Sequence, residues 1–143
     1  MTTRTSEEIR QKIARYVESI NHAEDLSIAE EVWNTVPESS FIHPRGHEYG
    51  WQEICRNFYG MTMREMFSRR ELKLVTEPQI IVYGDCAVAV FDWDFHATLR
   101  DDGSLLHTTG RESQVFAQIP GVGWRLVHVH YSGPPTTERG QGF

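Results

Sequence analysis

The sequence predicts an α+β protein, with helices in the first half of the chain and a β-sheet in the second. Up to about residue 67, apolar residues recur every three or four positions, which is the spacing of one buried helix face. From residue 71 onward the period changes to two, and glycine-containing turns separate the alternating runs. Helices followed by a series of strands place the helices together on one face of an antiparallel sheet.

Three helices are expected. The first covers residues 6–21, where Thr5 and Glu8 fit the capping-box pattern at its start. The second, shorter helix begins with Asp25 or Ser27 as its cap and ends before Pro37. The third begins near Gly50 and bends at Gly60.

The remaining chain is expected to form strands. A short strand covers residues 39–43, and residues 45–50 have the composition of a loop. Four strands follow over residues 71–83, 86–100, 105–118 and 124–132, the first of them disrupted at Pro78. These elements form a single domain over residues 1–135, and residues 136–143 form a flexible tail because they are polar and glycine-rich.

Length and charge limit the function. A chain of 143 residues is the size of one domain with a real hydrophobic core. Its 20 acidic and 14 basic residues give a net charge of -6, which opposes binding to nucleic acid. No apolar run approaches the ~20 residues that cross a bilayer, and no secretory leader precedes the first helix, so a cytoplasmic protein with no membrane partner is expected.

The last two strands carry an unusual mixture of side chains. Alternation places on one face of them the residues Glu112, Gln114, Phe116, Trp124, Leu126, His128 and His130. An acid, an amide and two imidazoles among aromatic residues are typical of a pocket wall, which is mostly apolar with a few polar groups. The alternative is a half-buried sheet edge whose polar groups are satisfied by their neighbours.

The strand at residues 86–100 has two contrasting faces. Asp92 and Asp94 lie on one face, and Phe91, Trp93 and Phe95 lie on the other. Hydrophobicity alone buries the three aromatic residues and leaves both aspartates in water. The pattern itself leaves both orientations open.

Two segments resemble a known family. Glu-Ser-Gln-Val-Phe at 112–116 and Gly-Trp-Arg-Leu-Val-His-Val-His-Tyr-Ser-Gly-Pro-Pro at 123–135 resemble the last two strands of the association domain of calcium/calmodulin-dependent protein kinase II. They also resemble SnoaL-like proteins of the nuclear transport factor 2-like superfamily. The resemblance implies a cone-shaped α+β fold, in which three N-terminal helices pack on a curved antiparallel β-sheet of four to six strands and enclose a pocket.

The resemblance also implies an orientation for the strand at 86–100. Arginines line the association-domain pocket, and two of their positions correspond to Asp94 and Gln114 here. Asp94 is therefore expected to point inward as the catalytic base, with His128 as the second catalytic residue. Phe91, Trp93 and Phe95 would then lie on the outer face and anchor a homodimer. Replacement of arginines by an acid and an amide argues against a carboxylate ligand.

The other expected ligand-binding residues are His43, Tyr16, Trp33, Tyr59, Asp92, Glu112, Gln114 and His130. Simpler roles remain open for several of them: the aromatic residues suit the core, His43 suits a turn cap, and Glu112 suits an ion pair with Arg111 or Arg125. His128 and His130 could hold a metal with His43 or Glu112 as a third ligand. Two histidines on one face are weak evidence, so neither a metal nor a cofactor is expected.

The sequence thus predicts a pocket protein that binds a small, largely apolar molecule and also associates with itself as a homodimer or higher oligomer. Its polar groups suit cofactor-independent acid-base chemistry such as isomerisation, cyclisation or dehydration. A non-catalytic association module and a simple ligand-binding protein are the alternatives, because a fold does not determine a reaction.

Overall fold

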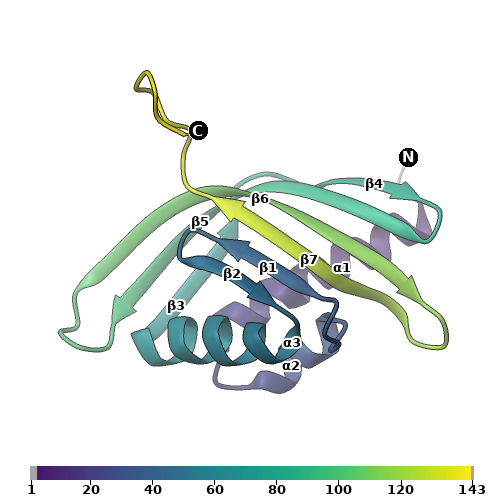
Figure 1. Cartoon of the computed structure of the whole chain (residues 1–143), viewed down its shortest axis with the longest axis horizontal. Helices are drawn as coiled ribbons and strands as arrows, with labels where there is room; N and C mark the ends of the chain where they lie inside the picture. Colours follow the sequence, from purple (N-terminus) through teal and green to yellow (C-terminus); the bar gives the residue numbers. More distant parts are fainter. Residues whose placement is uncertain (1–2, 143) are drawn as a thin grey trace.

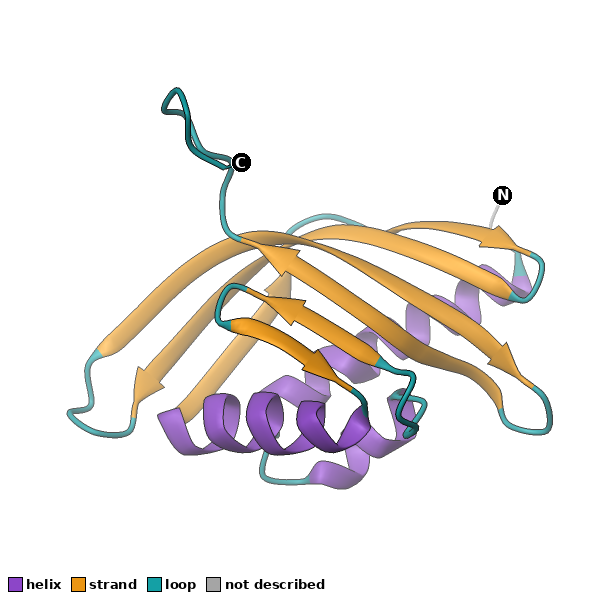
Figure 2. Ribbon diagram, viewed as in Figure 1, coloured by secondary structure: helices purple, strands orange, loops and turns teal. Residues whose placement is uncertain are grey.

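A strongly curved sheet of seven strands covers three helical segments in the computed structural model, which describes residues 3–142 (Figures 1 and 2). The strand order is β2-β1-β7-β6-β5-β3, and β4 also pairs with β5. Neighbouring strands are antiparallel except β1 and β7, which run parallel. The predicted α+β class with helices on one face of a curved sheet is confirmed. The predicted domain and tail include residues 1, 2 and 143, which lie outside the described residues.

The helical segments begin and end close to the predicted positions. Helix α1 (Arg4–Asn21) is capped by Thr3, whose side chain accepts the Ser6 N–H, so the predicted cap at Thr5 was two residues late. Helix α2 (Leu26–Val32) is capped by Asp25. Helix α3 (Trp51–Glu53) continues directly into η1 (Ile54–Glu65), a π-helical segment that replaces the predicted bend at Gly60. No helix among residues 3–142 has the length and apolarity needed to span a membrane.

The π-helical segment explains an irregular apolar pattern. Its buried side chains include Phe58 and Met63, five positions apart, whereas Met61 is 58% exposed. A π-helix pairs residues five apart instead of four, so the buried face recurs at a longer spacing than in an α-helix. The wider turn therefore places Phe58, Thr62 and Met63 together against the interior of the sheet.

The strands are β1 (Ser40–His43), β2 (Gly46–Tyr49), β3 (Phe67–Leu74), β4 (Gln79–Tyr83), β5 (Cys86–Leu99), β6 (Leu105–Ile119) and β7 (Gly123–Ser132). Strand β2 occupies the segment predicted as a loop, because Gly46 lets the chain turn back and pair with β1. Strands β3 and β4 both pair with β5 along one edge and are separated near Pro78.

A buried arginine joins the elements around the interior. Arg70 on β3 is 5% exposed and donates hydrogen bonds to the carbonyl oxygens of Ile20, Met63 and Phe67, at 2.8–2.9 Å. It also pairs with Glu24. Because a buried guanidinium is stable only when its donors are satisfied, these contacts fix the ends of α1 and η1 against β3.

Candidate functional site

A cavity of about 660 Å³ lies between the helices and the inner face of the sheet. Its lining residues come from α1, the β1–β2 turn, η1, β3, β5, β6 and β7, and most of them are apolar. The residues that contribute are Tyr16, Ile20, Pro44, Arg45, Phe58, Thr62, Met63, Met66, Phe67, Leu72, Trp93, Phe95, Leu106, His107, Thr108, Thr109, Glu112, Tyr131, Gly133 and Pro134. A space of this size, with apolar walls and few polar groups, suits one small organic molecule.

One end of the cavity is bordered by a sheet edge. Pairing between β6 and β7 begins at Arg111 and Ser132, so the earlier part of β6 is paired with β5 alone. Thr108 and Thr109 from this edge line the cavity. Pro44 and Arg45 from the β1–β2 turn, together with the chain that follows β7, complete this end.

Glu112 is the carboxyl group of the cavity wall. It is only 5% exposed, and Gln114, two residues along the same face of β6, donates a hydrogen bond from Nε2 to its Oε2 at 2.6 Å. Burial raises the pKa of Glu112 to about 8, with the hydrogen bond from Gln114 acting in the opposite direction. Both the neutral acid and the carboxylate are therefore populated near neutral pH.

Two tyrosines share this environment. Burial raises the pKa of Tyr16, and the negative charge of Glu112 raises it further. The pKa of Tyr131 is also raised, mainly by burial and to a smaller extent by the negative charge of Glu112. Both phenols therefore stay protonated and can serve as hydrogen-bond donors beside Glu112.

A tryptophan covers part of the sheet next to these groups. Trp93 on β5 faces Gly110 on β6, and a Cβ at Gly110 would lie only 2.2 Å from the indole ring. The glycine therefore lets the ring lie across the inner face, where it meets Tyr131 edge to face at 5.4 Å. The buried Trp93 Nε1 has no hydrogen-bond partner among residues 3–142. A buried donor of this kind can be satisfied by a ligand acceptor.

His43 lies directly behind the cavity wall. Its Nε2 lies 2.7 Å from Glu48 Oε2, and its Nδ1 accepts the Arg45 backbone N–H at 3.2 Å, so Nε2 carries the proton and donates to the carboxylate. Asn57 donates to the other Glu48 oxygen at 2.7 Å. His43 thus fixes the turn that carries Arg45, as in the turn-cap alternative, and its ring stacks near Tyr131.

Trp33 and Tyr59 are placed in the helical core. Trp33 Nε1 donates to the Tyr59 hydroxyl at 3.0 Å, and that hydroxyl lies 2.8 Å from Ser19 Oγ, which itself donates to the Tyr16 carbonyl. Both aromatic residues are fully buried, and neither lines the cavity. Of the three predicted aromatic ligand-binding residues, Tyr16 alone lines it.

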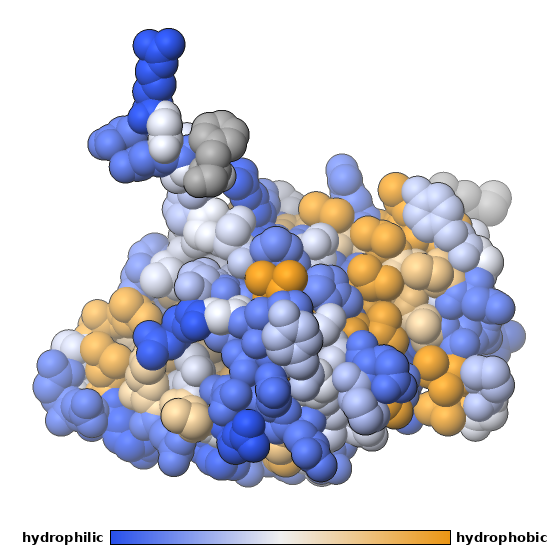
Figure 3. All heavy atoms as spheres, viewed as in Figure 1, coloured by the Kyte–Doolittle hydropathy of each residue, from blue (hydrophilic) through white to orange (hydrophobic). Residues whose placement is uncertain are grey.

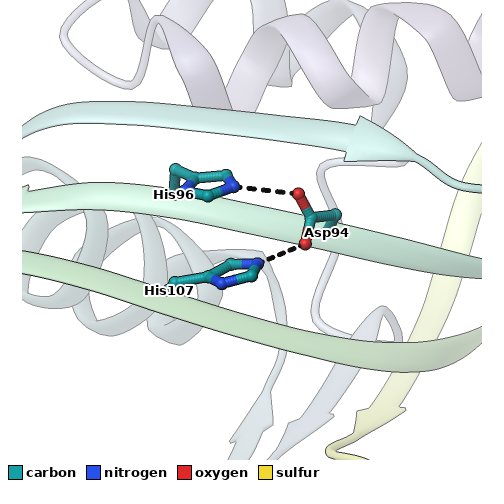
Figure 4. Close-up of side chains that lie close together, drawn as sticks. All are labelled: Asp94, His96 and His107. Atoms are coloured by element: carbon teal, nitrogen blue, oxygen red, sulfur yellow. Dashed lines mark hydrogen bonds and ion pairs between the residues drawn. The ribbon is translucent and has the colours of Figure 1, made fainter.

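The predicted orientation of Asp94 was wrong. Phe91, Trp93 and Phe95 face the interior, and Asp92 and Asp94 point outward, as hydrophobicity alone predicted. Asp94 contacts both His96 and His107 on the outer face (Figure 4). A hydrogen bond from His107 lowers the pKa of Asp94, which is the opposite of the shift expected for a shielded base. The three aromatic residues consequently cannot anchor an outer dimer interface.

The predicted orientation of the β7 histidines was also wrong. The pairing of β6 and β7 shifts register between Val115 and Phe116, which face His128 and Leu126 respectively, so Val127 is an extra residue. Such a β-bulge reverses the alternation beyond it. Val129 and Tyr131 therefore face inward, whereas His128 bonds Ser40 Oγ at 2.7 Å on the outer side and His130 is exposed. Burial is the main cause that lowers the pKa of His128, and the positive charges of His130 and His47 lower it further.

The structure brings together Tyr16, Glu112 and Gln114 from the predicted site and adds residues that the sequence analysis did not select. Trp93 was not selected as a pocket residue because the resemblance implied that Asp94 points inward, although the alternation of Trp93 with Asp92 and Asp94 was present in the sequence. Tyr131 was not selected because strict alternation puts it on the face opposite His128 and His130, and no sequence signal marked the bulge. The five-residue spacing of Phe58 and Met63 was the one sequence signal that these two residues of η1 share a face toward the cavity.

The comparisons with known proteins agree with this fold. A model of the SnoaL-like domain matches residues 9–137. This chain belongs to the SnoaL-like domain family. None of the curated proteins matches the chain.

Solved structures place this SnoaL-like protein in the nuclear transport factor 2-like superfamily. A superfamily protein from Salmonella enterica serovar Typhimurium LT2 is 56% identical over 96% of each chain, with a TM-score of 0.93. A type 2 hexachlorocyclohexane dehydrochlorinase is 12% identical over 94% of this chain and 89% of its own, with a TM-score of 0.75. The S. rosetta CaMKII hub is 18% identical over 94% of this chain and 100% of its own, with a TM-score of 0.73. The predicted resemblance to SnoaL-like proteins is confirmed, and the resemblance to the association domain of calcium/calmodulin-dependent protein kinase II is confirmed at the level of fold.

Proposed function

We propose that this chain is an acid-base enzyme that moves a proton on a small, largely apolar molecule held in the cavity. The observation that carries the proposal is Glu112, a buried carboxyl group in an apolar wall with a pKa of about 8. Proton transfer is most efficient when the pKa of the acid or base lies near the working pH. Glu112 therefore replaces Asp94 as the proposed proton-transferring residue.

The neighbours of Glu112 have separate roles in this proposal. Gln114 holds one carboxyl oxygen at 2.6 Å and leaves the other free to exchange a proton with the ligand. The unpaired Nε1–H of Trp93 and the phenols of Tyr16 and Tyr131 are donors for a ligand oxygen. Donors fixed beside the reacting atom stabilise negative charge that develops during proton removal.

The lining limits the substrate class. Most wall residues are aromatic or aliphatic, and Arg45 is the one arginine or lysine among the lining residues. A compact apolar molecule with one oxygen function satisfies both the walls and the few donors. The fold is shared with a dehydrochlorinase, and removal of hydrogen chloride is itself a reaction in which a proton is lost. Isomerisation, cyclisation and elimination all fit this requirement.

Hydrogen-deuterium exchange detects proton removal even when the complete reaction is unknown. Small apolar ketones and esters with acidic C–H groups would be incubated in D₂O with the protein and followed by NMR. We expect exchange to be accelerated and Glu112→Gln to reduce the rate by at least ~100-fold, the usual contribution of a general acid or base.

Asp94→Asn is the matched control, since it removes a carboxylate from the outer face of the same sheet. Its exchange rate should stay close to that of the wild type. Equal rates for the wild type and Glu112→Gln would contradict the proposal, and so would a large loss in Asp94→Asn alone. Circular dichroism of both variants would establish that the fold is retained.

A second function, self-association, is favoured by the outer face of the sheet. Ile81, Tyr83 and Val90 are 53%, 63% and 45% exposed. Val88 lies beside Ile81 in register, and Val115 lies on the other side of Val88. Figure 3 shows apolar surface on the side of the molecule where β4 lies. We infer that this patch pairs two copies of the chain, in place of the interface predicted at Phe91, Trp93 and Phe95.

Light scattering coupled to gel filtration tests the pairing. The wild type should have twice the mass of one chain, and Val90→Glu should have the mass of one chain because it places a charge in the patch. A wild-type monomer at tens of micromolar would contradict the inferred interface.

A further inference from the structure

Three side chains of the metal-ligating type meet on the outer face of the sheet, and His107 is the one among them that also borders the cavity. Asp94 and His96 are two residues apart on β5, so strand alternation points both outward. His107 on β6 stands directly opposite His96 in the β5–β6 register. The three side chains therefore come from two rigid, paired strands instead of from flexible loops (Figure 4).

The geometry points to a binding site for one divalent transition-metal ion, of the Zn²⁺ class, formed by Asp94, His96 and His107. His96 Nε2 lies 3.0 Å from Asp94 Oδ2, and His107 Nε2 lies 2.5 Å from Asp94 Oδ1. One ligand atom from each residue lies within 4.8 Å of the others. Two imidazoles and one carboxylate are a common ligand set for Zn²⁺ and related ions.

Only small shifts would be needed to accept an ion. Ligand atoms about 2.1 Å from a tetrahedral ion are about 3.4 Å apart, which falls within the separations already present. The two imidazole rings stack in parallel, with centroids 4.0 Å apart, so both Nε2 atoms reach the same carboxylate from one side. Metal binding would replace the protons that the imidazoles donate to Asp94.

The surroundings leave the ion accessible. The side chains of His96 and His107 are about half exposed, at 53% and 54%, and that of Asp94 is 28% exposed. Solvent or a ligand can therefore complete the coordination. Glu71 on β3 is next in register to His96, but it is engaged by Lys73 at 2.8 Å. Glu71 is therefore not included among the proposed metal ligands.

Other histidines of this face lack the same arrangement. His128 is bonded to Ser40, and neither it nor His130 belongs to a group of three ligands among residues 3–142. The combination of these two with His43 or Glu112, which the sequence left open as an alternative, is not formed, because His43 and Glu112 face the interior. His128 and His130 therefore provide a matched control with the same number of imidazoles.

Isothermal titration of the untagged chain with ZnCl₂, after removal of metal by a chelator, tests the proposal. We expect one ion per chain with a micromolar Kd, and MgCl₂ should not compete because Mg²⁺ prefers oxygen ligands. Asp94→Asn, His96→Gln and His107→Gln should each weaken Zn²⁺ binding at least tenfold. The His128→Gln/His130→Gln double variant should bind Zn²⁺ with the affinity of the wild type.

Each contrary result would overturn the site. Absence of Zn²⁺ binding at millimolar concentration, one ion per two chains, or equal affinity in the wild type and His96→Gln would each contradict it. Greater loss in the His128→Gln/His130→Gln variant than in His107→Gln would assign binding to other histidines. Circular dichroism would exclude unfolding as the cause, and Co²⁺ absorption spectra of the wild type and variants would report the ligands independently.

Discussion

The two faces of one sheet give two carboxyl groups opposite properties. Glu112, on the inner face of β6, has a raised pKa because burial removes water from its carboxylate. Asp94, on the outer face of the neighbouring strand β5, has a lowered pKa because His107 donates to it. The residue types are nearly the same, so the side of the sheet on which a carboxyl group lies decides its pKa.

The largest expected effect is on stability, when neighbouring residues on the two faces of β5 are each truncated to alanine. Phe91 is 2% exposed on the inner face, and Asp92 is exposed on the outer face. Phe91→Ala should reduce the free energy of unfolding by about 3–5 kcal/mol, because it removes a buried aromatic ring and leaves a cavity. Asp92→Ala should change it by less than about 0.5 kcal/mol. Urea denaturation of both variants measures this, and similar losses would contradict the assigned faces.

The next effect is the pH dependence of stability. Because the folded-state pKa of Glu112 is raised above its ordinary value of 4.5, the folded chain holds a proton that the unfolded chain has released between about pH 4.5 and pH 8. Its contribution to stability is therefore lost as pH rises, by up to ~1.4 kcal/mol per pH unit. Glu112→Gln should stabilise the protein by a few kcal/mol more at pH 8.5 than at pH 5.

Asp94 should show the opposite sign. Its folded pKa is lowered, so it contributes stability above its ordinary pKa of 3.8, and that contribution is lost as pH falls through the folded pKa. Asp94→Asn should therefore reduce stability at neutral pH and lose this effect in acid. Thermal melts of both variants between pH 3 and pH 9 measure the two trends, and parallel curves would contradict the comparison.

A smaller effect distinguishes two histidines of the β1–β2 hairpin. His43 is buried and donates to the buried Glu48, whereas His47 is exposed on the outer side. His43→Ala should cost about 1–3 kcal/mol because it leaves a buried carboxylate without one of its partners. His47→Ala should cost less than about 0.5 kcal/mol. Equal unfolding midpoints for these variants would show that the pairing of His43 with Glu48 does not stabilise the hairpin.

Much of the fold followed from the sequence because periodicity records burial directly. Alternation in β5 separated Phe91, Trp93 and Phe95 from the aspartates, and hydrophobicity indicated correctly that these three are buried. The family resemblance gave the opposite orientation and was wrong. The site was harder to predict because one extra residue, Val127, reverses a strand face without any marker in the local sequence. The π-helical wall likewise depends on backbone pairing that helix periodicity does not encode.

The inward orientation of Glu112 and Gln114 could be predicted from the sequence. The extra residue lies on β7, so the alternation of Glu112, Gln114 and Phe116 along β6 is uninterrupted and was sufficient to put them on one face. Their partner groups come from elements distant in sequence, including Tyr16 on α1 and Trp93 on β5. A single sequence cannot give those distances, and for that reason the raised pKa of Glu112 could not be predicted from it.

An NMR titration of Glu112, in protein labelled with ¹³C at glutamate side chains, tests directly whether this carboxyl group is enclosed in the cavity and has a raised pKa. The Glu112 resonance would be assigned by its loss in Glu112→Gln. We predict a midpoint near pH 8 in the folded wild type, since burial is the main cause of the shift. A midpoint near the ordinary glutamate value of 4.5 would contradict the proposed role of Glu112, because Glu112 would then be a solvated carboxylate and not an acid-base group enclosed in the cavity.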